Sequence, residues 1–384
     1  MEWELRKFIS PDVQFGVGAR SLVGQYARKL HGKLALIVTY PDVIEAGWVK
    51  NVQDNLAAEG VDSVVYPDVT PNAKDREVMG GAEVYKSSGC NMIIAVGGGS
   101  VIDCAKGIGV VSTNNGQIQD FYGDDKVRIP IPKLITVQTT AGTGVSVTRY
   151  AMISDTKHKA KMSVDSPLII PVAALEDPEM AVTMDNYATV CSGADAITQA
   201  LEGFVSKTHS PITDLLAIQA VGETMEYLPR VIERTQDVDL RGHMTLANIS
   251  GGLVTSNASV GLVHSISHAI GGLYDLTHGE INMALLEYVV EYNFEDAMER
   301  YRQIAYYMGI DSDSMPPILI KQEIINAIRE FRNNIGLTKS LSELGVQRQD
   351  FAFLARNALN DFALGSNPKK PSQKDIESIC EQAY

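Results

Sequence analysis

The stretch "CNMIIAVGGGSVIDCAKGIGV", residues 90–110, decides the fold. It begins with an apolar run, continues through three glycines, and ends in a helical pattern that starts near Ser100. A buried parallel strand that passes through a tight turn into a helix has this form. We expect Ser100 to cap the helix, with Asp103 three residues further on, as in a capping box.

The glycine turn predicts a phosphate site. Ligands of a parallel sheet bind at the carboxyl ends of its strands, which is where this turn lies. Glycines let backbone amides approach an anion without Cβ atoms in the way, and the helix N-terminus favours negative charge. We therefore expect a pyrophosphate on the amides from Gly98 to Ser100. The alternative is a tight turn that holds no ligand.

Strand and helix patterns alternate around this stretch. Residues 33–40 ("KLALIVTY") and 62–69 ("DSVVYPDV") have strand composition, and residues 74–89 have helical spacing closed by Gly89. Further strands are expected at residues 131–137 and 172–179, with a hairpin over residues 149–165. This order predicts a parallel sheet with right-handed crossovers.

From Asn186 onward, the apolar residues recur at a helical period of about 3.6. Helical patterns cover residues 186–206, 212–233, 240–270, 295–307, 319–334 and 350–363. We therefore predict an α/β dinucleotide-binding domain over residues 1–185 and an all-helical domain over residues 186–384.

Composition excludes several classes of function. The apolar fraction of 45% is ordinary for a globular protein, and no apolar run is long enough to span a membrane. A net charge of −14 argues against nucleic acid as a partner. The charged start lacks the apolar core of a signal peptide, and the four cysteines are scattered without a CxxC motif. We expect a cytoplasmic protein.

A second candidate nucleotide loop is "TVQTTAGTG", residues 136–144, which follows an apolar strand. Its hydroxyls and glycine amides suit the phosphates and the nicotinamide amide of a dinucleotide. A polar loop without a ligand is the alternative interpretation.

The stretch "VHSISHAIGGLYDLTHG", residues 263–279, gathers three histidines. A helix ending at Gly271–Gly272 would place His264 and His268 on one face. We expect His278 to return from a loop, so that three imidazoles converge on a divalent metal. Asp195, in an otherwise apolar helix, is the candidate carboxylate, since an unpaired buried carboxylate is costly. Separate roles for the histidines, and a cap or ion pair for Asp195, are the alternatives.

Over nearly its whole length, the chain resembles the iron-containing (group III) alcohol dehydrogenases. The resemblance rests on "PNAK" (71–74), "GGGSVIDCAKGIG" (97–109), "TTAGTGVSVTRY" (139–150), "GADAITQALEGFVS" (193–206) and "GLVHSISHAIGGLYDLTHGEINMALL" (261–286). It implies a Rossmann-like α/β domain with a parallel sheet, an all-helical C-terminal domain, and an active site in the cleft between them. This is the fold shared with the dehydroquinate synthases.

The resemblance also implies a metal site. The family's four ligands fall on Asp195, Gln199, His264 and His278, and the residue matching His268 lies near the nicotinamide. Asp195, His264 and His278 thus join His268 as expected catalytic residues. Gln199 departs from the family, which has histidine there. It either ligates through its amide oxygen, or holds a water that does so, or leaves a weak or absent metal with His268 recruited.

The resemblance further implies a dinucleotide site. The residues expected to form it are Tyr40, Asn72, Gly98, Gly99, Ser100, Val101, Ile102, Asp103, Thr139, Thr140, Thr143 and Lys161. Tyr40 stands where the family often has an aspartate, and Asp42 follows two residues later, so NAD is expected and NADP is not excluded. Ser146 stands where many members have glutamate.

The reaction so implied is reversible hydride transfer between a small primary alcohol and NAD(P), with Fe²⁺ or Zn²⁺ as the metal. Such a metal holds the alkoxide as a Lewis acid, and His268 relays the proton or orients the nicotinamide. A homodimer or larger homo-oligomer is expected. The alternatives are a zinc polyol dehydrogenase of the glycerol type, a synthase of the dehydroquinate type, and a nucleotide-binding homologue that has lost its metal through Gln199.

Overall fold

The computed structural model describes residues 4–141, 144–158 and 160–384, and the chain divides into two compact units. The α/β unit comprises Ile9–Met184 and Gln236–Thr245. The helical unit comprises Met1–Phe8, Asp185–Thr235 and Leu246–Tyr384. No helix within the described residues combines the length and the hydropathy that a membrane crossing needs.

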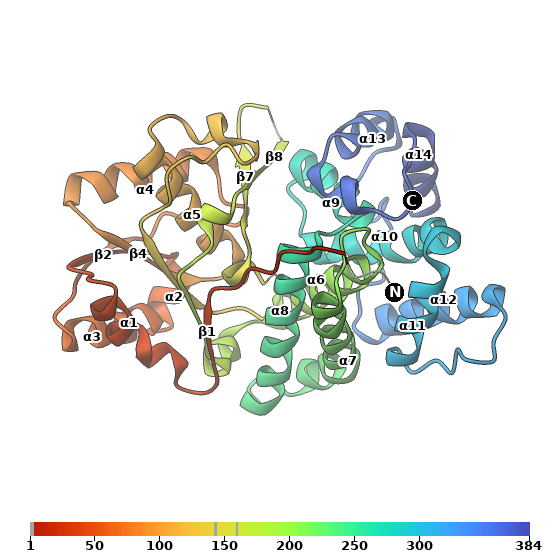
Figure 1. Ribbon diagram of the computed structural model, residues 1–384, viewed down its shortest axis with the longest axis horizontal. Helices are drawn as coiled ribbons and strands as arrows, with labels where there is room; N and C mark the ends of the chain where they lie inside the picture. The colour runs from red at the N-terminus through yellow and green to blue at the C-terminus, as the bar shows by residue number, and fades with distance from the viewer. Residues whose placement is uncertain (1–3, 142–143, 159) are drawn as a thin grey trace. The chain divides into compact units, whose positions relative to one another are not determined.

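The α/β unit is built on a six-stranded parallel sheet, as the sequence predicted (Figure 1). Its strand order is β1-β9-β6-β4-β2-β3. The strands are β1 (Asp12–Phe15), β2 (Leu34–Val38), β3 (Asp62–Tyr66), β4 (Met92–Gly97), β6 (Lys133–Gln138) and β9 (Ala173–Glu176). A smaller sheet holds β5 (Gly123–Asp124), β7 (Tyr150–Asp155) and β8 (Ala160–Asp165), the last two as the expected hairpin.

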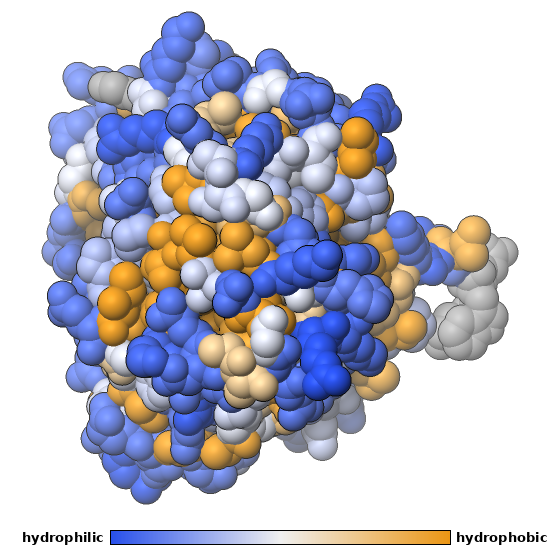
Figure 2. Space-filling view, turned by 90° about the vertical axis from the view of Figure 1, so that its left-hand side faces the viewer, coloured by the Kyte–Doolittle hydropathy of each residue, from blue (hydrophilic) through white to orange (hydrophobic). Residues whose placement is uncertain are grey.

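Helices cover both faces of the large sheet, because its strands are apolar on both sides. On one face, residues such as Ile37 and Ile94 pack against α1 (Val23–Lys29) and α3 (Trp48–Ala58). On the other, their neighbours, such as Leu36, pack against α4 (Asp75–Ser88) and α5 (Gly99–Asn114). The short helix α2 (Pro41–Glu45) follows β2. On the side of α3 and α4, hydrophobic residues gather near the middle of the surface among hydrophilic ones (Figure 2).

The prediction that Ser100 caps α5 is wrong. The helix begins at Gly99 with Gly98 as its N-cap, and no side chain caps it. The Ser100 hydroxyl instead accepts a hydrogen bond from the backbone N–H of Asn72, at 3.0 Å. The reason is that Asn72 takes a left-handed conformation, with φ 57°, which directs its amide toward the start of α5.

The helical unit contains α6 (Asn186–Val205), α7 (Pro211–Glu233), most of α8 (Val238–Ala258), α9 (Leu262–Tyr274), α10 (His278–Asn293), α11 (Met298–Tyr307), α12 (Pro317–Asn334), α13 (Phe351–Leu359) and α14 (Gln373–Gln382). Three expectations fail here. The pattern over residues 240–270 is two helices, because Ser259 has φ 61° and breaks the run, and the second helix continues past Gly271–Gly272 to Tyr274. His278 is the first residue of α10 rather than part of a loop.

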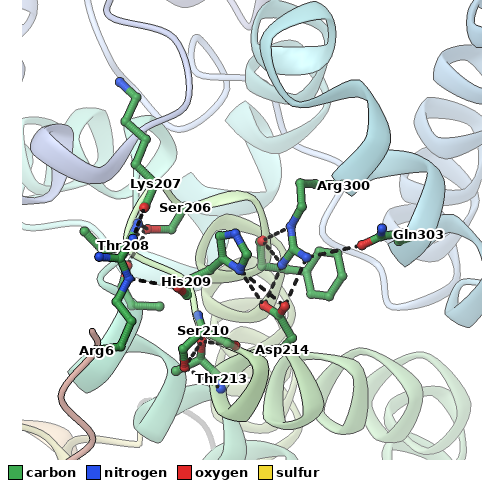
Figure 3. Close-up of polar contacts among 12 residues, drawn as sticks. Arg6, Ser206, Lys207, Thr208, His209, Ser210, Thr213, Asp214, Arg300 and Gln303 are labelled. Carbon is green, nitrogen blue, oxygen red and sulfur yellow. Dashed lines mark hydrogen bonds and ion pairs between the residues drawn. The ribbon is translucent and has the colours of Figure 1, made fainter. Parts of the chain in front are cut away.

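The connection between α6 and α7 is held by a polar cluster that Figure 3 shows. Arg300 donates to both carboxylate oxygens of Asp214, at 3.0 and 2.5 Å, and its guanidinium lies 3.8 Å from the centre of the Phe204 ring. Arg6, from the N-terminal segment, donates to the backbone carbonyls of Lys207 and His209. These contacts fix the C-terminal end of α6, the helix that carries Asp195.

A buried carboxyl at the end of β9 makes the stability of the α/β unit depend on pH. Glu176 is 1% exposed, and burial raises the pKa of its side chain to about 7, while the Ser146 hydroxyl opposes the shift. The folded protein holds this proton more tightly than the unfolded chain, whose carboxyl titrates near 4.5. The stabilisation is therefore complete below about pH 4.5 and is lost as the pH rises to about 7.

Glu176→Gln removes this titration. We expect its free energy of unfolding to rise relative to the parent by about 3 kcal/mol between pH 4.5 and pH 8. Urea titrations of both proteins across this range, followed by Trp fluorescence and circular dichroism, measure the difference. A difference that stays constant with pH would show that Glu176 is ionised at the same pH in the folded and unfolded states.

Candidate active site

Three helices of the helical unit each present a pair of polar residues four positions apart. The pairs are Asp195 and Gln199 on α6, His264 and His268 on α9, and His278 and Asn282 on α10. Residues at this spacing share one face of a helix. The three helices pack against one another, so the pairs meet inside the unit.

A close approach of two backbones makes this meeting possible. A Cβ atom on Gly279 would lie 2.0 Å from the carbonyl oxygen of Cys191. Only glycine therefore lets the start of α10 lie directly on α6. This contact brings Asn282 to within hydrogen-bonding distance of Asp195.

Asp195 is the centre of the group. It is 5% exposed and accepts a hydrogen bond at each oxygen from a side-chain amide. Asn282 donates to Oδ1 at 2.7 Å, and Gln199 donates to Oδ2 at 3.0 Å. Nε2 of His264 lies 3.2 Å from Oδ1.

His264 is held between two buried carboxylates. Its Nδ1 lies 2.6 Å from Glu202 Oε2, and its Nε2 faces Asp195. Burial alone would lower the pKa of His264, but the hydrogen bonds to Asp195 and Glu202 raise that pKa to about 10. The surroundings thus favour positive charge at this ring. A carboxylate on one ring nitrogen, with the other directed at a second acidic ligand, is the usual setting of a metal-bound histidine.

His268 and His278 complete the cluster of imidazoles. The ring of His268 lies 5.9 Å from that of His264 and 5.3 Å from that of His278, centre to centre. His268 Nδ1 lies 2.9 Å from Asp361 Oδ2, and the ring stacks on Phe362. His278 Nδ1 lies 3.1 Å from the Ser267 hydroxyl.

The donor set fits a divalent metal. Among residues 4–141, 144–158 and 160–384, no three His, Cys, Asp or Glu side chains form a group able to hold a metal ion by themselves. Asp195 and His264 are two such residues in contact, and amides from Gln199 and Asn282 surround the same carboxylate. A carboxylate and an imidazole are ligands that Fe²⁺ and Zn²⁺ accept. The two amides turn their nitrogens to Asp195, and each also carries an oxygen of a kind that such metals accept.

Most of the expected dinucleotide residues meet at the carboxyl ends of β4 and β6 in the α/β unit. Lys161 Nζ donates to Asn72 Oδ1 at 2.6 Å, and Asn72 donates in turn to Ser100. Thr139 donates its backbone N–H to the carbonyl of Gly97 at 3.1 Å. Thr143 lies outside the described residues.

The remaining expected residues differ in what they can offer a ligand. Val101 and Ile102 are fully buried in the core, so only their backbone is available. Tyr40 is the N-cap of α2 directly after β2, with Asp42 in the first turn. Asp103 is buried beside Lys106, and burial raises the pKa of this carboxyl while Lys106 and Lys161 oppose the shift.

Four residues that contact the candidate metal group or the dinucleotide residues were not assigned from the sequence. Glu202 and Asn282 lie in motifs quoted above, at seven residues from Asp195 and four from His278, so helical spacing could have identified both. Asp361 gave no such signal. Lys106 is fully buried and donates to the carbonyls of Val145, Thr148 and Tyr150. These bonds fix the segment that directly follows the second candidate nucleotide loop, residues 136–144, called the threonine loop below.

Known proteins resemble the chain throughout. Residues 10–178 match the family described as iron-containing alcohol dehydrogenase, and residues 189–384 match the C-terminal part of the Fe-containing alcohol dehydrogenase family. A 1,3-propanediol dehydrogenase of Citrobacter freundii is 36% identical, with both chains covered completely. An NAD-dependent methanol dehydrogenase of Bacillus methanolicus is 35% identical over 98% of this chain and 99% of its own. The solved alcohol dehydrogenase of Oenococcus oeni superposes with a TM-score of 0.95 at 34% identity, over 99% of this chain and all of its own.

Proposed function

The chain belongs to the iron-containing alcohol dehydrogenase family. On that premise we propose which of its residues bind the metal, the proton and the cofactor of an NAD-linked alcohol dehydrogenase. The reaction is reversible hydride transfer between a small primary alcohol and the nicotinamide, with Fe²⁺ as the metal and Zn²⁺ as a possible substitute. The relatives support this function better than a glycerol-type dehydrogenase or a homologue without metal. The observation that carries the assignment is His264, held between the buried carboxylates of Asp195 and Glu202.

In this proposal Asp195, Gln199, His264 and His278 hold the metal. When bound, the metal supplies Lewis acidity that stabilises an alkoxide. Glu202 keeps the Nδ1 proton of His264 and so directs Nε2 toward Asp195. Because Asp361 engages Nδ1 of His268, Nε2 is the atom of that ring available to take the proton lost by the alcohol.

The dinucleotide belongs to the α/β unit. The amides from Gly98 to Ser100 bind the pyrophosphate at the start of α5. Asn72, Asp103, Thr139, Thr140 and Lys161 line the same end of the sheet, and Lys106 holds the threonine loop in place. NAD is preferred over NADP, because Asp42 at the start of α2 would repel a 2′-phosphate.

The experiment that tests this function joins metal analysis to turnover. Protein purified without oxygen is analysed for bound metals, and NADH formation is then followed with a panel of primary alcohols, with glycerol as the polyol for comparison. We expect bound metal and NADH formation with at least one primary alcohol. Turnover of glycerol alone, or NAD binding without turnover of any alcohol, would overturn the proposal.

We also propose that the protein works in the cytoplasm as a homodimer or larger homo-oligomer. The support is that all four cysteines are buried thiols, as in a reducing compartment, and that Phe15 is exposed on β1 at the edge of the sheet. Light scattering coupled to size-exclusion chromatography measures the oligomeric state. A mass of a single chain at micromolar concentration would contradict this proposal.

Gln199→His restores the imidazole that the family carries. Because the amide of Gln199 lies 3.0 Å from Asp195 Oδ2, position 199 borders the ligand group, and an imidazole there is a better ligand than an amide. We expect the affinities for Zn²⁺ and Fe²⁺ to rise on the order of 10- to 100-fold. Anaerobic metal titrations of parent and variant measure this, with Gln219→His, at an exposed position of α7, as the matched control. Equal affinities would place position 199 outside the coordination shell.

A further inference from the structure

Asn282 is fully buried on α10, and its amide lies at the metal group itself. Its nitrogen is 2.7 Å from Asp195 Oδ1 and 3.5 Å from His264 Nε2. These two atoms are in turn 3.2 Å apart. The three atoms form a triangle whose members come from three different helices.

The size of this triangle is that of a coordination shell. Ligand atoms about 2.1 Å from a metal lie roughly 3.0 to 3.4 Å from one another in octahedral or tetrahedral sites. The three separations, 2.7, 3.2 and 3.5 Å, bracket that range. The amide of Asn282 therefore occupies a position from which a ligand would reach a metal shared with Asp195 and His264.

In the present orientation of this amide, its oxygen accepts no hydrogen bond from the described residues. Nδ2 faces the carboxylate, and Oδ1 is buried with no hydrogen-bond partner among the described residues. Buried acceptors are nearly always satisfied. A half-turn about the last side-chain bond exchanges the two ends of the amide at little cost in shape. The oxygen then faces the cation, and the N–H no longer points at it.

The amide of Gln199 is placed differently. It contacts the other oxygen of Asp195, and its Oε1 would lie 2.9 Å from a Cβ atom on Gly251 of α8. The oxygen is thus directed at α8, and Asn282 is the amide inside the triangle with His264.

We propose that Asn282 is a further metal ligand of this chain, through Oδ1, and that it compensates for the weaker amide ligand that position 199 has in place of an imidazole. The inference rests on the proposed function, since it requires a metal at Asp195. It adds a ligand from α10 to the set carried over from the family.

A double-mutant cycle tests this assignment with Co²⁺ as the probe. We expect Asn282→Leu to weaken Co²⁺ binding on the order of 10- to 100-fold in the parent. In the Gln199→His background, where an imidazole fills the shell, the same change has a much smaller effect. If Asn282 only donated to Asp195, its loss would weaken binding equally in both backgrounds, to within about twofold, and the proposal would be overturned.

Two further readouts sharpen the test. Asn282→Asp keeps an oxygen ligand and removes the donor, so we expect Co²⁺ affinity at or above that of the parent; a loss as large as that of Asn282→Leu would contradict ligation. The visible absorption of bound Co²⁺ should change in Asn282→Leu, since its intensity depends on coordination number; an unchanged spectrum would also overturn the proposal.

Asn293→Leu is the matched control. Asn293 is a buried asparagine on the same helix, paired with Asn367, and its loss should leave Co²⁺ binding as in the parent. Circular dichroism establishes that each variant is folded. A parent that binds no Co²⁺, Zn²⁺ or Fe²⁺ would overturn the proposed function and this inference with it, whereas parent binding that Asn282→Leu leaves unchanged would overturn the inference alone.

Discussion

Asp195→Ala is expected to remove the metal and to lower kcat/KM at least ~10³-fold, since a metal that stabilises an alkoxide supplies several kcal/mol. Asp195 is the residue on which the group converges. The amides of Gln199 and Asn282 and Nε2 of His264 all contact its two oxygens. Without the carboxylate, no acidic ligand remains on α6, and His264 keeps only Glu202.

The measurement combines metal analysis, alcohol oxidation and NAD binding. NAD affinity should stay near that of the parent, because the residues assigned to the cofactor belong to the α/β unit, so intact NAD binding separates loss of metal from loss of fold. Asp313→Ala, on an exposed loop of the helical unit, is the matched control and should retain metal and activity. Full metal content and turnover in Asp195→Ala would refute the assignment of the metal site.

The α/β unit was predictable because its signals are local. Apolar runs ending in turn residues gave β2, β4 and β6, and the three glycines located the turn before α5. What failed was the cap, since the partner of Ser100 is Asn72, 28 residues earlier in the chain. A pairing of this kind depends on a left-handed residue whose conformation no periodicity reveals. Strand β1 was also missed, because it has only four residues and pairs with β9, which lies far along the chain.

The candidate metal group was predictable only in part. Helical spacing pairs His264 with His268, yet the structure places His264 against Asp195 and Glu202, which come from a helix more than 60 residues earlier. Asp195 was proposed because a buried carboxylate needs a partner, and the family resemblance then placed it with His264, which spacing could not do. Asn282 has the helical spacing from His278 that could have identified it, but it was missed because a neutral asparagine carries no charge that needs a buried partner.

The second large effect is expected for a substitution at Gly98, just before the start of α5, which should weaken NAD binding. A Cβ atom on Gly98 would lie 2.8 Å from Cγ2 and 3.2 Å from Oγ1 of Thr140, closer than van der Waals contact allows. A side chain there displaces the threonine loop and fills the approach to the amides of Gly99 and Ser100. These amides can bind a pyrophosphate only while that approach is open.

We therefore expect Gly98→Val to weaken NAD binding at least ~100-fold, since losing two hydrogen bonds to a charged phosphate removes about 3 kcal/mol or more. Gly98→Ala should have an intermediate effect. Gly107→Ala separates crowding from ligand contact. Gly107 lies on the same helix as Gly99, about two turns from the start of α5, and a Cβ atom there would lie 2.9 Å from the side chain of Val78. That control should bind NAD as the parent does. Calorimetric titration with NAD measures all three, and metal content should not change, since the metal residues lie in the helical unit. If Gly98→Val bound NAD as tightly as Gly107→Ala, the pyrophosphate would have to bind elsewhere, and the turn after β4 would be only a tight connection between strand and helix.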